Sequence, residues 1–144
     1  MISLLIIDET DNVDYFLYKF NLSKNDKKRI LFLKNFYLES ISKKTFTKDN
    51  LFKILYLNGK QSLLDVLYYQ MIKSKFNSKK IKELIYFFKD KPSPIFPITA
   101  KKLIDNYSLS EGKELGTKLK QIEERWIKNN FKINDNEINN IIKS

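Results

Sequence analysis

Residues 96–131 decide the predicted fold of this chain. They contain the stretches FPITAKKLI at 96–104, GKELGTKL at 112–119 and EERW at 123–126. Thr99 follows a proline-rich strip and precedes good helix formers, so it is a candidate N-cap for a short first helix. A second helix is expected to start near 110–112, after a polar turn. Its apolar residues recur at helical spacing and predict one continuous stripe: Leu115, Leu119, Ile122 and Trp126.

Two glycines mark the beginning of that second helix. Gly112 precedes it, and Gly116 lies one turn inside, where glycine costs about 1 kcal/mol relative to alanine. Either another backbone packs close to Gly116, or the backbone of a ligand does. A helix start has free N–H groups and a positive dipole end, which with nearby lysines suits a phosphate. The alternative is an ordinary helical hairpin in which the glycines only allow close packing.

The same residues carry a family resemblance. Phe96-Pro97-Ile98-Thr99-Ala100, Leu103, the glycine pair, Leu119 and Trp126 together resemble the C-terminal region of bacterial tRNA nucleotidyltransferases and the related poly(A) polymerases. In that family a proline-led turn precedes a short helix, and a glycine pair then opens a longer helix that ends near a tryptophan. This chain has Ala100 where the family usually carries glycine, and Lys113 where a proline is common. Residues 21–29 show a weaker resemblance to the same family.

The resemblance implies the RNA-contacting C-terminal part of such a protein, without its catalytic head. The chain would bind tRNA or another structured RNA mainly by shape and charge. It would hold no cofactor, because Mg²⁺ and nucleoside triphosphates would belong to the missing head. That head is either a separately encoded partner chain or lost from a broken gene, and its product, CCA or poly(A), stays open. The predicted RNA-binding residues are Lys101, Lys102, Gly112, Lys113, Gly116 and Lys120.

Catalytic and metal sites are not expected in this chain. Nucleotide transfer needs metal ions held by paired carboxylates, and the resembling enzymes use a glycine-serine turn followed by Asp-x-Asp, neither of which occurs here. Histidine and cysteine are absent, which removes the commonest general base, thiolate ligands and disulfides. The acidic groups at 8–14 and 135–137 are expected on a solvated surface and at a helix start, where carboxylates favour the dipole. Their members are Asp8, Asp11, Asp14, Asp135 and Glu137.

Composition bounds the fold and the partners. The chain has 144 residues, 42% of them hydrophobic, but only three glycines and three prolines, which argues against β-sandwiches and barrels. The net charge of +10 favours polyanions, nucleic acid above all. Lysine excess with only two arginines, Arg29 and Arg125, is also typical of an A/T-rich genome, so an unrelated basic helical domain stays an alternative.

Hydrophobic spacing predicts five helices before residue 91, at 11–20, 23–40, 51–57, 62–73 and 78–89. Ser23 and Thr47 are candidate N-caps, and Gly59 is expected to close the third helix at its C′ position. The helical aromatic residues are expected in the core or at its rim, in preference to stacking on bases. They are Tyr56, Tyr68, Tyr69, Tyr86 and Phe87.

The only proline cluster, at 91–97, cannot continue a helix and places a boundary there. We therefore expect a helical body-like domain at 1–91 and a helical hairpin with a tail at 92–144. The tail is expected to form a last short helix capped by Asn134, with Ile138, Ile141 and Ile142 on its apolar side. The predicted class is all-α, with seven to eight short helices in two unequal clusters.

The first seven residues, Met1 to Ile7, suggest a second hypothesis. They are apolar, too short to span a membrane and wrongly flanked for a signal peptide, so a cytoplasmic protein without a membrane partner is expected. The strip either packs on its own domain or docks on another polypeptide. In the second case the chain would be a protein-interaction subunit that binds a separate catalytic chain.

Overall fold

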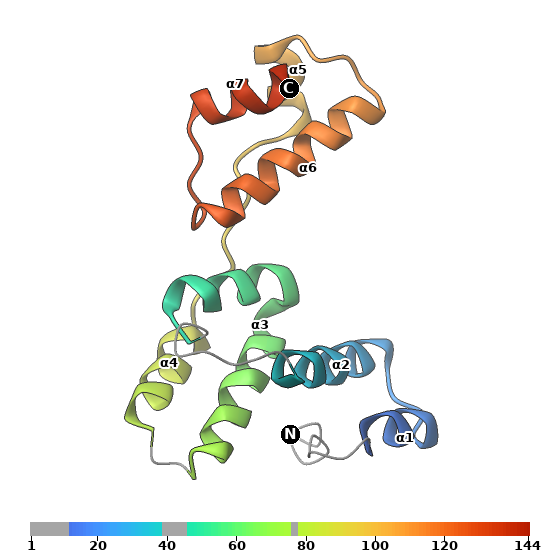
Figure 1. The fold of residues 1–144 in the computed structure, drawn as a ribbon, viewed down its shortest axis with the longest axis vertical. Helices are drawn as coiled ribbons and strands as arrows, with labels where there is room; N and C mark the ends of the chain where they lie inside the picture. The colour runs from blue at the N-terminus through green and yellow to red at the C-terminus, as the bar shows by residue number, and fades with distance from the viewer. Residues whose placement is uncertain (1–11, 39–45, 76–77) are drawn as a thin grey trace. The chain divides into compact units, whose positions relative to one another are not determined.

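The computed structural model describes residues 12–38, 46–75 and 78–144, and all regular elements in these ranges are α-helices (Figure 1). The predicted all-α class is confirmed. Seven helices occur in the described ranges: α1 Asn12–Lys19, α2 Lys24–Leu38, α3 Lys48–Lys73, α4 Lys79–Lys89, α5 Ala100–Tyr107, α6 Lys113–Lys128 and α7 Asp135–Lys143.

The chain divides into two compact units, Met1–Ser93 and Pro94–Ser144. The division lies inside the proline cluster at which the sequence places a boundary. Below, unit 1 denotes residues 1–93 and unit 2 denotes residues 94–144. Each unit has its own hydrophobic core, and each is described by itself.

Unit 1 is organised by α3, which packs against both α2 and α4, while α1 packs on α2 (Figure 1). The core contains Leu33 from α2, Leu63 from α3 and Phe88 from α4, none of which exposes measurable surface. Aromatic rings extend it, because Phe52 lies 5.0 Å from Phe88 between ring centroids. Helices α2, α3 and α4 therefore share one hydrophobic core.

Helix α3 is bent at Gly59, which has φ 82° and ψ 164°. The sequence predicts that this glycine closes one helix at a left-handed C′ position before a second helix begins. The structure confirms the break, because α3 consists of two helical parts that meet at a kink at this residue. It corrects two details: the first part begins earlier, at Lys48, and the glycine has an extended ψ. Only glycine readily adopts that combination of positive φ and extended ψ, so the bend depends on this residue.

A buried ion pair fastens α2 to the second half of α3. Arg29 Nε donates to Asp65 Oδ2 at 2.8 Å, and Arg29 Nη2 donates to Asp65 Oδ1 at 3.0 Å. Asp65 is 3% exposed, so its carboxylate depends on this two-pronged contact. Arg29 also reaches Asp26 at 3.2 Å. One of the two arginines of the chain is thus structural.

Tyr37 adds a second polar contact between the same helices. Its hydroxyl can donate to the Val66 carbonyl at 3.0 Å or to Gln70 Oε1 at 3.3 Å, and its ring lies edge-on to Tyr69 at 4.4 Å. Burial, and to a lesser degree the neighbouring Tyr69, raises the pKa of Tyr37. The phenol therefore stays neutral well into the alkaline range.

Unit 2 is built around α6, which packs against α5 and α7 (Figure 1). Leu103 and Ile122 are fully buried, and Ile138 of α7 is 1% exposed. Trp126 closes the core, with its ring 5.3 Å from Phe96 and 4.9 Å from Phe131. The predicted apolar stripe of this helix is confirmed, with Leu119 half-buried and the other three members buried.

Side-chain caps fix most of the helix starts, as the sequence predicts. Thr47 Oγ1 accepts from Asn50 N at 3.4 Å, and Thr99 Oγ1 accepts from Lys102 N at 3.2 Å. Asn134 forms a full capping box with Glu137. Each such cap contributes about 1 kcal/mol to helix stability. The start of α6 at Gly112 has no side-chain cap, and it is part of the candidate site.

Candidate nucleic-acid interface

Two of the predicted RNA-binding residues, Lys101 and Lys102, lie in the first turn of α5 and are exposed. The Thr99 cap holds this turn in place through the Lys102 N–H. Neither lysine forms an ion pair with any residue in the described ranges. Both ammonium groups are therefore available to an anion, next to the positive end of a short helix.

Gly112 and Lys113 form the start of α6. Gly112 is the N-cap residue, with φ 148° and ψ −166°, and it supplies no side-chain hydrogen bond to the helix. The first N–H groups of α6 are consequently not capped by that residue. Lys113 follows as an exposed residue, and it forms no ion pair within the described part of the chain.

Gly116 does not have the packing role that the sequence allowed for it. A methyl group added at Gly112 or at Gly116 would meet no neighbouring side chain or remote backbone atom of the described residues within 4 Å. Both glycines are exposed. The alternative of close helix packing is therefore wrong for the glycine pair. The cost of Gly116 to the helix is therefore not offset by close packing against any described residue.

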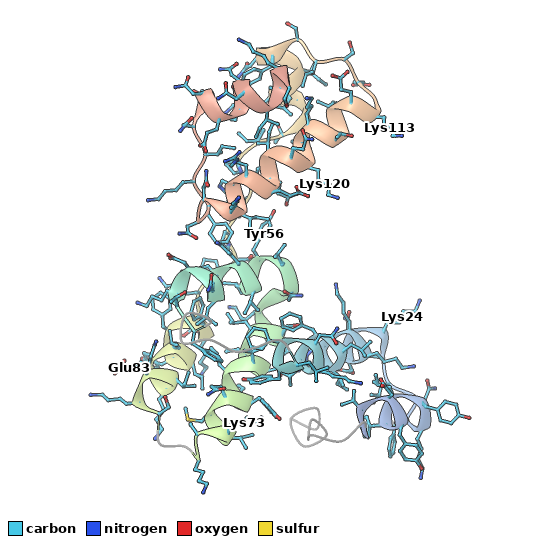
Figure 2. All side chains as sticks on the ribbon, viewed as in Figure 1. Lys24, Tyr56, Lys73, Glu83, Lys113 and Lys120 are labelled. Carbon is cyan, nitrogen blue, oxygen red and sulfur yellow. The ribbon has the colours of Figure 1, made fainter. Side chains whose placement is uncertain are left out.

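Lys120 lies about two turns further along α6 than Lys113, and Figure 2 shows both side chains projecting from the helix at separate points. Lys120 Nζ is 3.9 Å from Glu124 Oε1 at an exposed position, a contact worth less than about 1 kcal/mol. The structure thus brings Gly112, Lys113 and Gly116 together in one helix start. Lys101 and Lys102 lie on the neighbouring helix α5 of the same unit.

One lysine of α6 lies between the candidate lysines in sequence but has a structural role. Lys118 Nζ donates to the Ile141 carbonyl at 2.9 Å and fastens α6 to the end of α7. At the opposite end of α7, Glu137 Oε1 accepts from Asn129 Nδ2 at 2.6 Å. These two contacts hold the scaffold on which the exposed lysines are displayed.

Two residues of the acidic groups, Asp14 and Glu137, have structural partners. Asp14 Oδ2 accepts from Lys34 Nζ at 2.7 Å, and Glu137 serves the capping box of α7. Asp8 and Asp11 lie outside the described residues. Among the residues that are described, no group of three or more acidic side chains is placed to hold a metal ion.

The N-terminal strip Met1 to Ile7, on which the docking hypothesis depends, lies outside the described residues. That hypothesis stays a prediction. Within the described ranges, no helix combines the length and apolar character that crossing a membrane requires.

The distribution of charge was not foreseen from the sequence. Unit 1 carries 18 basic and 10 acidic residues, a net charge of +8, whereas unit 2 carries nine and seven, a net charge of +2. The predicted contact residues therefore lie in the less basic unit. Sequence reasoning also missed a cluster of Lys48, Lys80 and Lys91 around Phe87 in unit 1. Lys48 and Lys91 are far apart in the chain, so no local pattern joins them.

Comparison with known proteins adds no relative: no family model matches the chain, and neither the curated proteins nor the solved structures contain a match.

Proposed function

We propose that this chain is a non-catalytic RNA-binding protein whose unit 2 docks on folded RNA such as tRNA. It is the C-terminal part of a tRNA nucleotidyltransferase-like or poly(A) polymerase-like system. The catalytic head, with its Mg²⁺ and nucleotide sites, would be a separate chain. The observation that carries the proposal is the exposed start of each of the helices α5 and α6. Lys101, Lys102 and Lys113 lie there without ion-pair partners in the described residues, and Gly112 and Gly116 are exposed at the start of α6.

The proposed mechanism is electrostatic docking on the ribose-phosphate backbone. Lys101, Lys102 and Lys113 would contact phosphates, and the uncapped start of α6 would present N–H groups to another. The open space above Gly116 would let the RNA backbone approach the helix closely. Such contacts recognise the shape of a folded RNA and carry little base specificity.

A charge-reversal series tests this function. The double variant K101E/K102E should weaken tRNA binding in gel shifts and reduce the dependence of affinity on salt, because two phosphate contacts are lost. The matched control is K132E/K143E, which changes the net charge of unit 2 equally at two other exposed lysines. Equal weakening by both variants, or an unchanged gel shift for K101E/K102E at several salt concentrations, would contradict the proposal.

The link to a catalytic head has its own test. A head chain from the same genome, carrying the glycine-serine turn and Asp-x-Asp, would be mixed with this chain and with tRNA that lacks its 3′ end. Nucleotide addition that requires both chains is expected. Nucleotide addition by the head alone at the same rate would show that this chain has no role in the reaction. That result would not contradict RNA binding by the chain.

A further inference from the structure

A groove in unit 1 gathers lysines around one aromatic ring. Its volume is about 980 Å³, and it is lined by the start of α3, by one face of α4 and by the residues that follow α4. The lysines in its lining are Lys48, Lys80 and Lys91. Phe87 lies among them, and its neighbour Tyr86 also lines the groove.

Two of the three ammonium groups are positioned by the Phe87 ring. Lys48 Nζ lies 4.1 Å from the ring centroid, and Lys91 Nζ lies 4.9 Å from it. Both distances are within the range of cation–π attraction, which is about 0.5–1 kcal/mol at exposed sites. No carboxylate of the described residues forms an ion pair with any of the three lysines. Two ammonium groups without a direct ion pair among the described residues therefore lie close to one ring.

The rest of the lining differs from that of a simple anion site. Glu83 and Asp90 also line the groove, and Figure 2 shows Glu83 projecting outward from α4. Their carboxylates can accept hydrogen bonds from ribose hydroxyls and from base amino groups. Tyr86 is 84% exposed, so its ring offers an open face. An unpaired base could stack on that face, which a peptide of acidic residues could not do.

We propose that this groove binds a short single-stranded segment of RNA. Phosphates would contact Lys48, Lys80 and Lys91, a base would stack on Tyr86, and Glu83 and Asp90 would accept hydrogen bonds from sugar or base donors. The inference rests on the proposed RNA-binding function and extends it with a second site. Unit 2 would recognise folded RNA by shape, while unit 1 would hold an unpaired strand.

Fluorescence anisotropy with the full chain tests the groove. The probe is a labelled single-stranded RNA of about ten nucleotides, within the usual site size of such grooves. Y86A should weaken binding about tenfold, as loss of one stacked base does. The matched control is Y18A, which removes a tyrosine that is 90% exposed on α1. Y18A should leave the affinity unchanged, and neither change removes a buried side chain.

A lysine series provides the second measurement. K48Q/K80Q/K91Q should reduce the salt dependence of single-strand binding by a slope of about two, from about 0.7 per phosphate contact. K24Q/K28Q/K60Q removes the same charge from exposed lysines elsewhere in unit 1 and should have a smaller effect. The proposed RNA site in the groove would be overturned if the two triple variants had equal effects on binding, or if Y86A and Y18A had equal effects. Displacement of the RNA by oligoglutamate as readily as by unlabelled RNA would overturn it too.

The two proposals fail in different ways. If K101E/K102E weakens tRNA binding while the groove variants keep wild-type affinity for the single strand, the groove is wrong and the proposed function stands. If the groove variants lose the single strand while K101E/K102E binds tRNA normally, the predicted site on α5 is wrong and the groove stands. If the wild-type chain binds neither RNA at low salt, both are wrong.

Discussion

Unit 1 carries most of the net positive charge of this protein, whereas unit 2 carries nearly all of the family resemblance. The residues behind the resemblance are mainly structural. Thr99 caps α5, Leu103 is fully buried, and Trp126 packs between Phe96 and Phe131. Among the positions that carry the resemblance, the glycine pair is exposed, and it lies at the start of α6. A sequence signature can therefore specify how a unit folds while most of the net charge of the chain lies elsewhere.

The two units also differ in how polar groups support the core. Unit 1 joins α2 to α3 through the buried Arg29–Asp65 pair and the Tyr37 hydroxyl. Unit 2 joins its helices mostly by apolar packing, with Lys118 and Glu137 as clamps at the ends of α7. The chain has one tryptophan, Trp126, and it lies in unit 2. Tryptophan fluorescence therefore reports on unit 2, whereas helical circular dichroism reports on both units.

A large loss of stability is expected at the buried ion pair. D65A should lower the free energy of unfolding of unit 1 by about 3 kcal/mol, toward the lower end of the range for broken buried pairs, because Arg29 is partly exposed. Circular dichroism should show an earlier transition, while the Trp126 fluorescence transition stays near that of the wild type.

The double variant R29M/D65L provides the control for that prediction. It replaces both charges by apolar side chains and should recover much of the lost stability, as such replacements often do. A wild-type unfolding curve for D65A would show that the pair contributes nothing. Parallel shifts of dichroism and fluorescence would show that the two units unfold as one.

Truncating a core side chain in unit 2 should have the opposite signature: the Trp126 fluorescence should change while the dichroism of unit 1 persists. I122A removes a fully buried side chain and should cost about 2–4 kcal/mol. A unit of 51 residues is marginally stable, so much of its structure should be lost at moderate temperature. The Trp126 emission should shift to longer wavelength while the dichroism of unit 1 persists. An unchanged Trp126 spectrum would contradict the assignment of this core.

Local sequence chemistry predicted the helices and their faces well. The caps at Thr47, Thr99 and Asn134 and the stripe ending at Trp126 are short-range features, so spacing alone reveals them. The interruption at Gly59 was predicted too, but its conformation was not. Glycine usually ends a helix in a left-handed conformation, whereas Gly59 combines a positive φ with an extended ψ.

The candidate site was less predictable, for a physical reason. The positions of Lys101, Lys102 and Lys113 on helix starts follow from the sequence, but the open space around Gly116 does not. The groove around Phe87 joins residues from the start of α3 with residues from the end of α4. Lys48 and Lys91 are far apart in the chain, and a contact between the outer ends of two successive helices leaves no periodic signal in either helix.

The bend of α3 gives a smaller effect. G59A should destabilise unit 1 by about 1–3 kcal/mol, because alanine is strained at φ 82° and ψ 164°. Added bulk is not the cause, since nothing among the described residues lies within 4 Å of the new methyl group. Chemical denaturation followed by dichroism measures the change. An unaltered or increased stability would mean that α3 can straighten at little cost.

Tyr37 gives the stability of unit 1 a pH dependence in alkaline solution. Its pKa is raised by burial, so the folded state keeps the phenol neutral above about pH 10, where an unfolded tyrosine ionises. The unfolded state then loses a proton that the folded state keeps, so the stability of unit 1 should fall as the pH rises above about 10. Y37F should show a smaller fall in the same pH series. Parallel curves for the two proteins would contradict the assignment.

The smallest stability change is expected at Gly116, and it has the opposite sign. G116A should stabilise unit 2 by about 1 kcal/mol, because alanine removes the helix cost of glycine and its methyl group meets no described neighbour within 4 Å. If the open space above α6 admits an RNA backbone, the same methyl group should weaken tRNA binding while the Trp126 transition moves to higher temperature. Higher stability together with weaker tRNA binding would separate the effect of the methyl group on ligand approach from its effect on folding. A variant that gains stability and binds tRNA as tightly as the wild type would leave Gly116 without a role in the interface.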